Sequence, residues 1–495
     1  MIFVIINIIE KFRKDINMKR ISLILAVIFL ALSLCACTPS NTETPVPSPT
    51  GGSGTEDKFD LETVYMKPGD TYRIYMYNLE NEETPEEYYV RGLLRDQLDL
   101  ADAQYIQKTY GVTIKYTPWK GSWFTEYCGA AASGEPLAEM LYTVGPHTLG
   151  QLYMWDGMAG SAMLPISDYD YVYKFDDREY WDVDAQNAVC YYGGKLYYVI
   201  PRLIGDNMVN LHQYTFYNKK YLSAAGYSPE SLVKTAKEGN WTWDYFRQVA
   251  MAVNDPDKQV YALLTGQENS LVYNLMFSNG GDYVKKETVN GLEVDRFSAH
   301  QNESLEAWSF YLDLEKNNLV MPKSMGGEDI WFRNGKAAMM LTHLNRSDTY
   351  SNYPELEFGI LPIPKAPGAE SYVSGLNWFM PYGIFKNIKN PEGVVQFMSL
   401  YFRPAYAMSS EENLMLLESE LSVRLQDEDS VQFAIDALDY TYPSNMLIYQ
   451  NTCAEYMWYA SESFVKGETT PDVYFASVAD AVNAKIDIYN GLADY

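Results

Sequence analysis

The chain has 495 residues, a length that allows two large lobes or two domains, and it carries 38 Lys and Arg residues against 65 Asp and Glu residues. Its formal net charge of −27 repels nucleic acid and anionic lipid headgroups, which excludes electrostatic binding to either. Five cysteines and four histidines occur without metal-binding spacing, so we expect no metal site and no cofactor.

The first feature along the chain is an apolar run from Ile21 to Cys37, which follows two basic residues. A basic start, an apolar stretch of this length, small residues and then a cysteine are typical of a lipoprotein signal peptide. Cys37 is the better lipid acceptor in the run, because Ala36 precedes it whereas a bulky leucine precedes the other cysteine. We therefore predict a signal peptide over residues 1–36, with Met18 as an alternative start, and a lipidated Cys37.

The segment that follows, residues 37–58, is rich in Pro, Ser, Thr and Gly and reads as a flexible linker. The alternative for the apolar run before it is a single transmembrane anchor, but the run is shorter than the roughly 20 apolar residues that a spanning helix needs. We expect a protein held by lipid on the extracellular face of a bacterial cell membrane.

Alternating strand patterns and helical spacings mix along the rest of the chain, which predicts an α/β fold that begins with a parallel sheet. Thr242 is the expected N-cap of one helix, and a proline at an N-terminal helix position opens another. The predicted strands are 71–79 and 112–116, and the predicted helices are 88–110, 149–163, 243–253, 303–317, 391–402 and 472–492.

Catalytic motifs are missing from the sequence: it contains no GxSxG elbow, no Walker loop and no GxGxxG turn. Pairs of carboxylates are abundant by chance among 65 acidic residues, so they do not identify a glycosidase, which needs a specific separation. We predict no catalytic residue and no enzymatic activity.

Seven short motifs occur in a fixed order over about 300 residues. Together they resemble the bacterial extracellular solute-binding proteins of family 1, the maltose-binding-protein-like lipoproteins of ABC transporters, over about residues 70–405. The motifs are ASGEPLAEML around Gly134, GGKLYYVIP from Gly193, FYNKKYLSAAG from Phe216, GNWTWDYF from Gly239, FRNGKAAM from Phe332, FGILPIPKAPG from Phe358 and NPEGVVQF from Asn390.

The resemblance implies a type II periplasmic-binding-protein fold, in which two α/β lobes are joined by crossover hinge strands and hold ligand in the cleft between them. On this chain it places the first lobe at residues 59–213 plus 337–376, and the second lobe at residues 218–330 plus 383–495. The crossovers are expected near 213–217, 330–336 and 376–381.

The same resemblance implies ligand-binding positions that face the cleft, in loops, on the strand before YNKK and at the third crossover. Trp378, in SGLNWF at the third crossover, is the preferred stacking platform, with plain core packing as its alternative. The loop at Asn345 and Arg346 replaces a tryptophan-containing loop, which argues against the sugar that the tryptophan-bearing relatives bind. The positions are Tyr142, His147, Asp206, Asn207, His212, Glu268, Asn269, Asn345, Arg346 and Trp378.

Aromatic content supports a sugar ligand, because the chain has 43 Tyr and 10 Trp residues and flat rings stack on the apolar faces of sugars. The resemblance implies a monomeric receptor that delivers a carbohydrate, expected to be an oligosaccharide, to the permease subunits of an ABC importer. The alternatives are a surface glycoside hydrolase, which predicts two essential carboxylates, and a carbohydrate-binding adhesin, which predicts binding without lobe closure.

Overall fold

Two β-sheets organise the computed structural model of the chain, which separates into the units Met1–Asp57 and Lys58–Tyr495. The predicted signal peptide, Cys37, the whole predicted linker and Cys453 lie outside the described residues. The structure describes residues 61–76, 79–89, 94–145, 148–153, 161–202, 211–266, 269–322, 325, 328–403, 410–449, 456–457 and 460–489.

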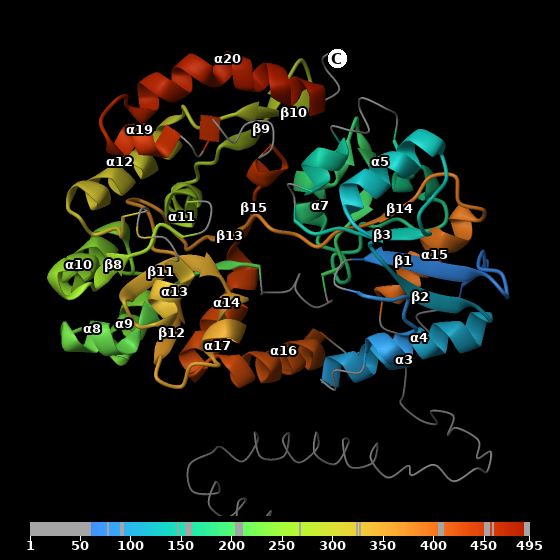
Figure 1. Cartoon of the computed structure of the whole chain (residues 1–495), viewed down its shortest axis with the longest axis horizontal. Helices are drawn as coiled ribbons and strands as arrows, with labels where there is room; N and C mark the ends of the chain where they lie inside the picture. The colour runs from blue at the N-terminus through green and yellow to red at the C-terminus, as the bar shows by residue number, and fades with distance from the viewer. Residues whose placement is uncertain are drawn as a thin grey trace, which may run out of the picture. The chain divides into compact units, whose positions relative to one another are not determined.

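The first lobe is built on a five-stranded sheet with the order β2-β1-β3-β14-β6. Strands β2 and β3 run parallel to β1, whereas β14 is antiparallel to both β3 and β6. Figure 1 shows this sheet with α5 and α7 on one side and α3 and α4 on the other. The elements of this lobe are β1 (Thr71–Met76), α3 (Pro85–Tyr88), α4 (Leu94–Tyr110), β2 (Thr113–Pro118), α5 (Trp123–Ser133), β3 (Met140–Tyr142), η1 (Ile166–Tyr169), α7 (Val183–Val189), β4 (Tyr191–Tyr192), β5 (Lys195–Leu196), β6 (Tyr198–Val199), β14 (Tyr382–Ile384) and α15 (Pro391–Tyr401).

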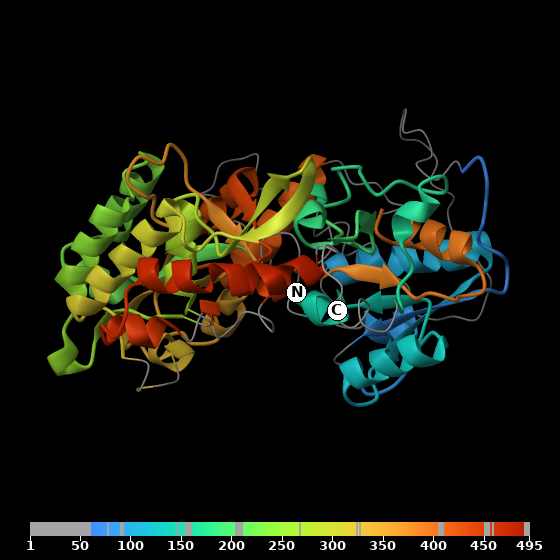
Figure 2. The same cartoon turned by 90° about the horizontal axis from the view of Figure 1, so that it is seen from above.

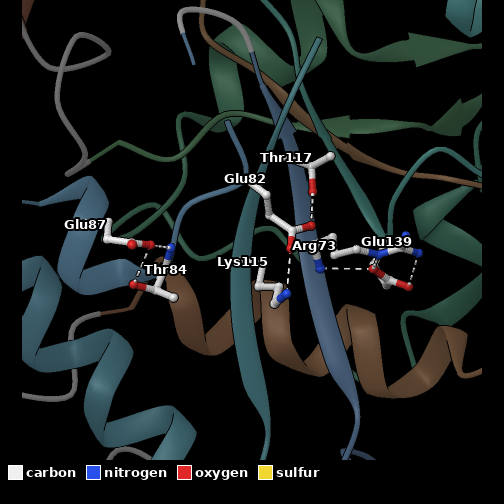
Figure 3. Close-up of polar contacts among 7 residues, drawn as sticks. All are labelled: Arg73, Glu82, Thr84, Glu87, Lys115, Thr117 and Glu139. Carbon is white, nitrogen blue, oxygen red and sulfur yellow. Dashed lines mark hydrogen bonds and ion pairs between the residues drawn. The ribbon is translucent and has the colours of Figure 1, made fainter. Parts of the chain in front are cut away.

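Polar side chains along β1 fix the approach to β3. Arg73 donates from its backbone N–H and from Nε to Glu139 Oε2, both at 2.9 Å, and from Nη2 to Glu139 Oε1 at 3.1 Å (Figure 3). A bidentate pair of this kind has a defined geometry. Glu139 belongs to the loop before β3, so the pair positions the start of that strand against β1.

In the same view, Thr84 and Glu87 form a capping box at the start of α3.

The second lobe is built on a four-stranded sheet with the order β12-β7-β11-β8, in which β7 is antiparallel to both neighbours and β8 is parallel to β11. A hairpin of β9 and β10 adds a separate two-stranded sheet. The elements of this lobe are β7 (Gln213–Asn218), α8 (Lys219–Ala224), α9 (Pro229–Lys237), α10 (Trp243–Val253), η3 (Pro256–Lys258), β8 (Tyr261–Leu263), α11 (Ser270–Ser278), β9 (Val284–Val289), β10 (Leu292–Phe297), α12 (Asn302–Lys316), α13 (Glu328–Arg333), β11 (Ala337–His343), α14 (Arg346–Tyr350), β12 (Phe358–Leu361), β13 (Ser374–Leu376), α16 (Ser410–Arg424), α17 (Glu428–Asp436), η6 (Ala437–Tyr440), β15 (Thr441–Pro443), η7 (Met446–Tyr449), α19 (Ala460–Val465) and α20 (Pro471–Tyr489).

The sheet pairing corrects the predicted division into lobes. Residues 337–376 were expected in the first lobe, but β11 and β12 both pair with β7, with Met339 opposite Tyr217 in the β11 ladder. The predicted crossover at 330–336 is wrong for the same reason, because α13 overlaps this segment, β11 follows it, and both elements belong to the second lobe. Conversely β14, which begins at Tyr382, pairs with β3, so the chain from there to α15 belongs to the first lobe.

Strands β13 and β15 pair with each other between the two larger sheets, as Figure 1 shows. His212 bridges to Leu376 beside them, which brings the chain entering β7 next to the chain leaving β13. The lobes also contact each other away from this crossover region. Arg95 Nε in α4 lies 3.0 Å from Glu420 Oε1 in α16.

Several predicted helices are present in the structure. Helix α10 begins after Thr242, whose side chain accepts from the backbone N–H of Tyr245, and α12, α15 and α20 lie where helices were expected. The predicted helix over 88–110 differs, because the described part of that stretch is divided between the end of α3 and α4. Within the described residues, no helix is both long enough and apolar enough to cross a membrane.

Candidate functional site

The parallel strands of both sheets end near the crossover segments, and ligands in α/β proteins bind beyond the carboxyl ends of such strands. In the first lobe, β3 ends at Tyr142, and the next residues pair with the crossover, since Thr143 N–H donates to the carbonyl of Pro381 at 3.0 Å. In the second lobe, β11 ends at His343. We call the group that lies here the strand-end cluster; its members are Tyr142, Thr143, Gln213, Thr265, Asn274, His343, Asn377, Trp378 and Tyr382.

Amide and imidazole groups form a connected network in this cluster. Asn377 Oδ1 accepts from Gln213 Nε2 at 3.1 Å and lies 3.3 Å from His343 Nε2. Gln213 Oε1 in turn accepts from Asn274 Nδ2 at 3.2 Å, which ties α11 to the start of β7. All four side chains are buried, so each bond is made away from water, where an unpaired group is costly.

His343 is a neutral donor in this network. Burial, which disfavours the charged imidazolium, lowers the pKa of His343 to about 4, and the nearby positive charge of Arg346 acts in the same direction. Because an amide oxygen only accepts, His343 carries its proton on Nε2 and donates it to Asn377. The imidazole therefore holds the crossover in place and is not poised as a general base near neutral pH.

Four polar atoms of the cluster have no partner among the residues that the structure describes: the hydroxyls of Thr143 and Thr265, Asn377 Nδ2 and Asn274 Oδ1. Leaving a buried donor or acceptor unpaired costs about 1–3 kcal/mol. The cluster thus combines two hydroxyl groups, one amide donor and one amide acceptor whose hydrogen-bonding capacity is unused by the described protein.

Aromatic rings stand beside these polar groups. Trp378 is half-buried, and its ring meets the edge of the His343 ring at a centroid distance of 6.2 Å. Tyr142 and Tyr382 pack with their centroids 4.8 Å apart across the pair β3 and β14. Rings together with uncharged hydrogen-bonding groups suit a polyhydroxylated ligand.

Catalytic and metal chemistry finds no support in the described part of the chain. It contains no group of three or more His, Cys, Asp or Glu residues placed to hold a metal ion. Cys190 is a buried free thiol, and burial raises the pKa of Cys190 well above its usual range, which keeps that thiol protonated and unreactive.

Comparison with known proteins decides the family. The sequence model of the bacterial extracellular solute-binding proteins matches residues 96–408, more than half of the chain. The chain belongs to this family. It is therefore a solute-binding protein and not an enzyme, as the missing catalytic motifs predicted. No curated protein matches the sequence.

Solved structures of other solute-binding proteins share the fold. The cyclic α-maltosyl-1,6-maltose binding protein from Arthrobacter globiformis is 15% identical, with a TM-score of 0.60 over 86% of this chain and 100% of the other. The GacH receptor of Streptomyces glaucescens is 17% identical, with a TM-score of 0.56 over 86% and 100%. An ABC substrate-binding protein from Listeria monocytogenes is 16% identical, with a TM-score of 0.55 over 85% and 99%. The predicted periplasmic-binding-protein fold is confirmed.

Some predicted site residues of this solute-binding protein lie in or beside the strand-end cluster. Trp378 and Tyr142 are members of it. Asn269 is buried in the left-handed conformation, with φ 63°, directly before α11. Arg346 opens α14 just after β11, whereas Asn345 is exposed and makes no side-chain cap bond. Their roles in binding stay predictions.

His212 lies in a different place. It lines a pocket of about 220 Å³ with Trp181, Arg202 and Thr441, and none of the residues lining that pocket belongs to the strand-end cluster. Its Nε2 lies 2.8 Å from Thr441 Oγ1, and burial lowers the pKa of His212 to about 3. The remaining predicted positions, His147, Asp206, Asn207 and Glu268, lie outside the described residues.

Sequence reasoning missed the amide residues of the network, Gln213, Asn274 and Asn377. Asn377 is adjacent to Trp378 in SGLNWF, and Gln213 follows His212, so both stood next to predicted positions. A buried amide in an otherwise apolar stretch was the available signal. Their pairing depends on contacts over 164 and 61 residues of sequence, which no local pattern specifies.

Proposed function

We propose that this solute-binding protein captures a carbohydrate, expected to be an oligosaccharide, at the strand-end cluster and delivers it to an ABC importer. The observation that carries the proposal is that aromatic rings and uncharged polar groups occur where strands of both sheets end. Trp378 packs on His343 at the end of β11, Tyr142 packs on Tyr382 at the end of β3, and buried hydroxyl and amide atoms of Thr143, Thr265, Asn274 and Asn377 have no partner among the described residues. Rings stack on the apolar faces of a sugar, while hydroxyl and amide groups bond its hydroxyls.

Binding needs no chemistry on the sugar. A ligand that contacts both lobes favours the lobe arrangement in which both sets of contacts form, by the difference in affinity between the open and closed states. Micromolar binding corresponds to about −8 kcal/mol, which a few stacked rings and hydrogen bonds supply. The crossover after β13, residues 376–381, is the natural hinge, because it leads from β13 of the second lobe to β14 of the first and includes Asn377 of the polar network.

Relatives with this fold support the ligand class. Their structures include complexes with acarbose, cycloalternan and maltotetraose. These sugars differ in size and linkage, so they support a carbohydrate and leave the particular sugar open.

Delivery follows from the predicted anchor. A lipid on Cys37 and the flexible segment after it would keep the receptor at the extracellular face of the membrane, beside permease subunits on other chains. Cys37→Ala is expected to release the protein from the cell and to impair uptake, because the tether and not the binding site is lost.

The test is a titration of the purified protein, without its signal peptide, with maltose, maltotriose, maltotetraose and mannotriose, followed by intrinsic tryptophan fluorescence. Saturable binding to at least one sugar, with the sugar recovered intact, is expected. Steady release of shorter sugars would establish a glycoside hydrolase instead. Saturable binding that leaves small-angle scattering unchanged would favour an adhesin, since lobe closure reduces the radius of gyration.

A further inference from the structure

A second pocket, of about 470 Å³, lies between the two lobes and is lined by tyrosines from both. Tyr153 and Tyr192 reach it from the first lobe, and Tyr449 and Tyr489 from the second. Figure 2 shows α20 extending along the second lobe with its C-terminal end toward the first, and Tyr489 is the last residue of this helix. We call this site the tyrosine pocket.

The rings of the tyrosine pocket are held in place by their neighbours. Tyr153 and Tyr192 stack with centroids 5.5 Å apart and an interplanar angle of 9°, and the Tyr153 hydroxyl donates to the Val189 carbonyl at 3.0 Å. Tyr449 and Tyr489 meet edge to face at 5.1 Å. Fixed rings lose little conformational entropy when a flat apolar ligand face packs on them.

A buried carboxylate orders the floor of the pocket. Asp295 accepts from Lys286 Nζ at 2.9 Å and from Asn445 Nδ2 at 2.8 Å, and it also accepts from the Tyr449 hydroxyl. These donors use the hydrogen-bonding capacity of Asp295, so it positions Tyr449 and Lys286 and does not act as a free anion. Asn187, an exposed residue of α7, lines the pocket from the first lobe.

The charges of the lining narrow the ligand class. Lys286 carries one positive charge, and Glu293 and Asp295 carry two negative charges, so the formal sum is −1. An anionic ligand is disfavoured by that sum, and Lys286 opposes a cation. Stacked rings beside amide, ammonium and carboxylate groups match the apolar faces and hydroxyls of a sugar.

The tyrosine pocket and the strand-end cluster share no residue. The pocket's first-lobe wall comes from the helical residues 148–153, from α7 and from the turn between β4 and β5, and its second-lobe wall from β9, β10, η7 and α20. A volume of about 470 Å³ falls within the range of roughly 300–1,000 Å³ that small-molecule sites occupy.

We propose that the tyrosine pocket is a second carbohydrate-binding site, sized for a mono- or disaccharide. The proposal shares its ligand class with the proposed function but none of its residues. Because the ligand contacts both lobes, its binding depends on how the lobes are arranged, so occupancy of the two sites is thermodynamically linked.

The test is isothermal titration calorimetry of the protein with glucose and with maltose. The wild type is expected to show two sites. Tyr192→Ala and Asn187→Ala are each expected to weaken binding in the tyrosine pocket by at least tenfold. Trp378→Ala is expected to weaken binding only at the strand-end cluster. Tyr171→Ala is the matched control, because Tyr171 is 65% exposed and lies outside both sites, and it is expected to change neither. Thermal unfolding of each variant checks that it is folded.

Different results overturn different claims. A single site that Tyr192→Ala and Asn187→Ala leave unchanged, or no binding of either sugar, refutes the tyrosine pocket as a sugar site. Binding of tetramethylammonium but not of sugar, lost in Tyr192→Ala, refutes the ligand class. If instead Trp378→Ala changes nothing while Tyr192→Ala removes binding, the second site stands and the assignment of the strand-end cluster fails.

Discussion

The strand-end cluster and the tyrosine pocket both combine aromatic rings with polar groups, but they are held together differently. In the strand-end cluster, Gln213, His343 and Asn377 are neutral, buried and bonded to one another at the hinge itself. In the tyrosine pocket, the charged residue Asp295 orders the second-lobe wall through its bond to Lys286. The first-lobe wall is formed by other elements of the chain.

This difference shows which contacts fix the geometry of each site. The strand-end cluster is fixed by the crossover, whose backbone and side chains are bonded to both sheets. The tyrosine pocket keeps its shape only while the lobes keep their mutual position. Changes at the hinge should therefore affect stability and the first site, whereas changes where the lobes touch should affect the second.

The largest expected effect comes from Asn377→Leu. This variant leaves the Gln213 amide and the His343 imidazole without their shared acceptor, and each unpaired buried group costs about 1–3 kcal/mol. The free energy of unfolding, measured by urea denaturation, should fall by about 3 kcal/mol. The control is Asn352→Ala, an exposed position whose loss should cost no more than about 0.5 kcal/mol. Equal losses in both variants would mean that the network does not hold the hinge.

Trp378→Ala should weaken carbohydrate binding by roughly thirtyfold, because a buried tryptophan anchor contributes about 2 kcal/mol to an interface. Trp378→Phe keeps a ring and should lose less. Trp331→Ala removes a half-buried tryptophan that packs on Tyr261, away from the strand-end cluster, and should leave affinity unchanged. Fluorescence titration measures all three. If Trp378→Ala bound the sugar with wild-type affinity, Trp378 would be a core-packing residue and not a stacking platform.

Gly150→Ala tests the contact between the lobes. A Cβ at position 150 would lie 1.8 Å from the carbonyl oxygen of Ile448, so backbone must move. We expect a loss of about 1–3 kcal/mol in thermal or urea unfolding, as for other overpacked sites, together with weaker binding in the tyrosine pocket. Gly129→Ala is the matched control, since nothing lies within 4 Å of its added Cβ and alanine favours its helix. A Gly150→Ala protein as stable as Gly129→Ala would contradict this contact.

The pH dependence of stability should report the buried state of His343. Its pKa is about 4 in the folded protein and about 6.5 when unfolded, so the unfolded chain binds more protons between these values. Stability is therefore lost as the pH falls from 6.5 to 4, by at most about 1.4 kcal/mol per pH unit. His343→Gln, which can still donate to Asn377, should show a shallower slope over the same window. Parallel slopes for the two proteins would mean that His343 is not held neutral.

Cys37→Ala should have the smallest effect on either site. The cysteine precedes the folded lobes in the sequence, so purified Cys37→Ala protein should bind sugar with wild-type affinity while cell fractionation finds it in the medium. Cys35→Ala is the control, and it should stay with the membrane. If Cys37→Ala remained in the membrane fraction, the lipid anchor would be refuted.

Local elements were predictable because their signals are local. Thr242 before a helical apolar stripe and Pro391 at a helix start predicted α10 and α15. The division into lobes was not predictable in this way, because the place of β11 and β12 beside β7 depends on strand pairing between distant segments. The alternation of apolar and polar residues predicts which face of a strand is buried, but it does not predict which strands pair with it.

The candidate site was predictable in part for the same reason. Trp378 and Tyr142 followed from motifs that mark the family, and the structure brings both to the strand ends. The amides that orient the cluster were missed. The role of Asn377 depends on its hydrogen bonds to Gln213 and His343, which lie far from it in sequence. The second-lobe wall of the tyrosine pocket includes the hairpin of β9 and β10 and helix α20, and the sequence shows no family motif in these elements.

The central claim is that sugar is bound at the strand ends and released unchanged. Its most direct test is calorimetric titration of the wild type and of Trp378→Ala with maltotriose, with chromatography of the sugar afterwards. We predict saturable binding by the wild type, binding at least tenfold weaker in Trp378→Ala, and only intact maltotriose. Equal affinity in the two proteins, or shortened sugar after incubation with the wild type, would contradict the account.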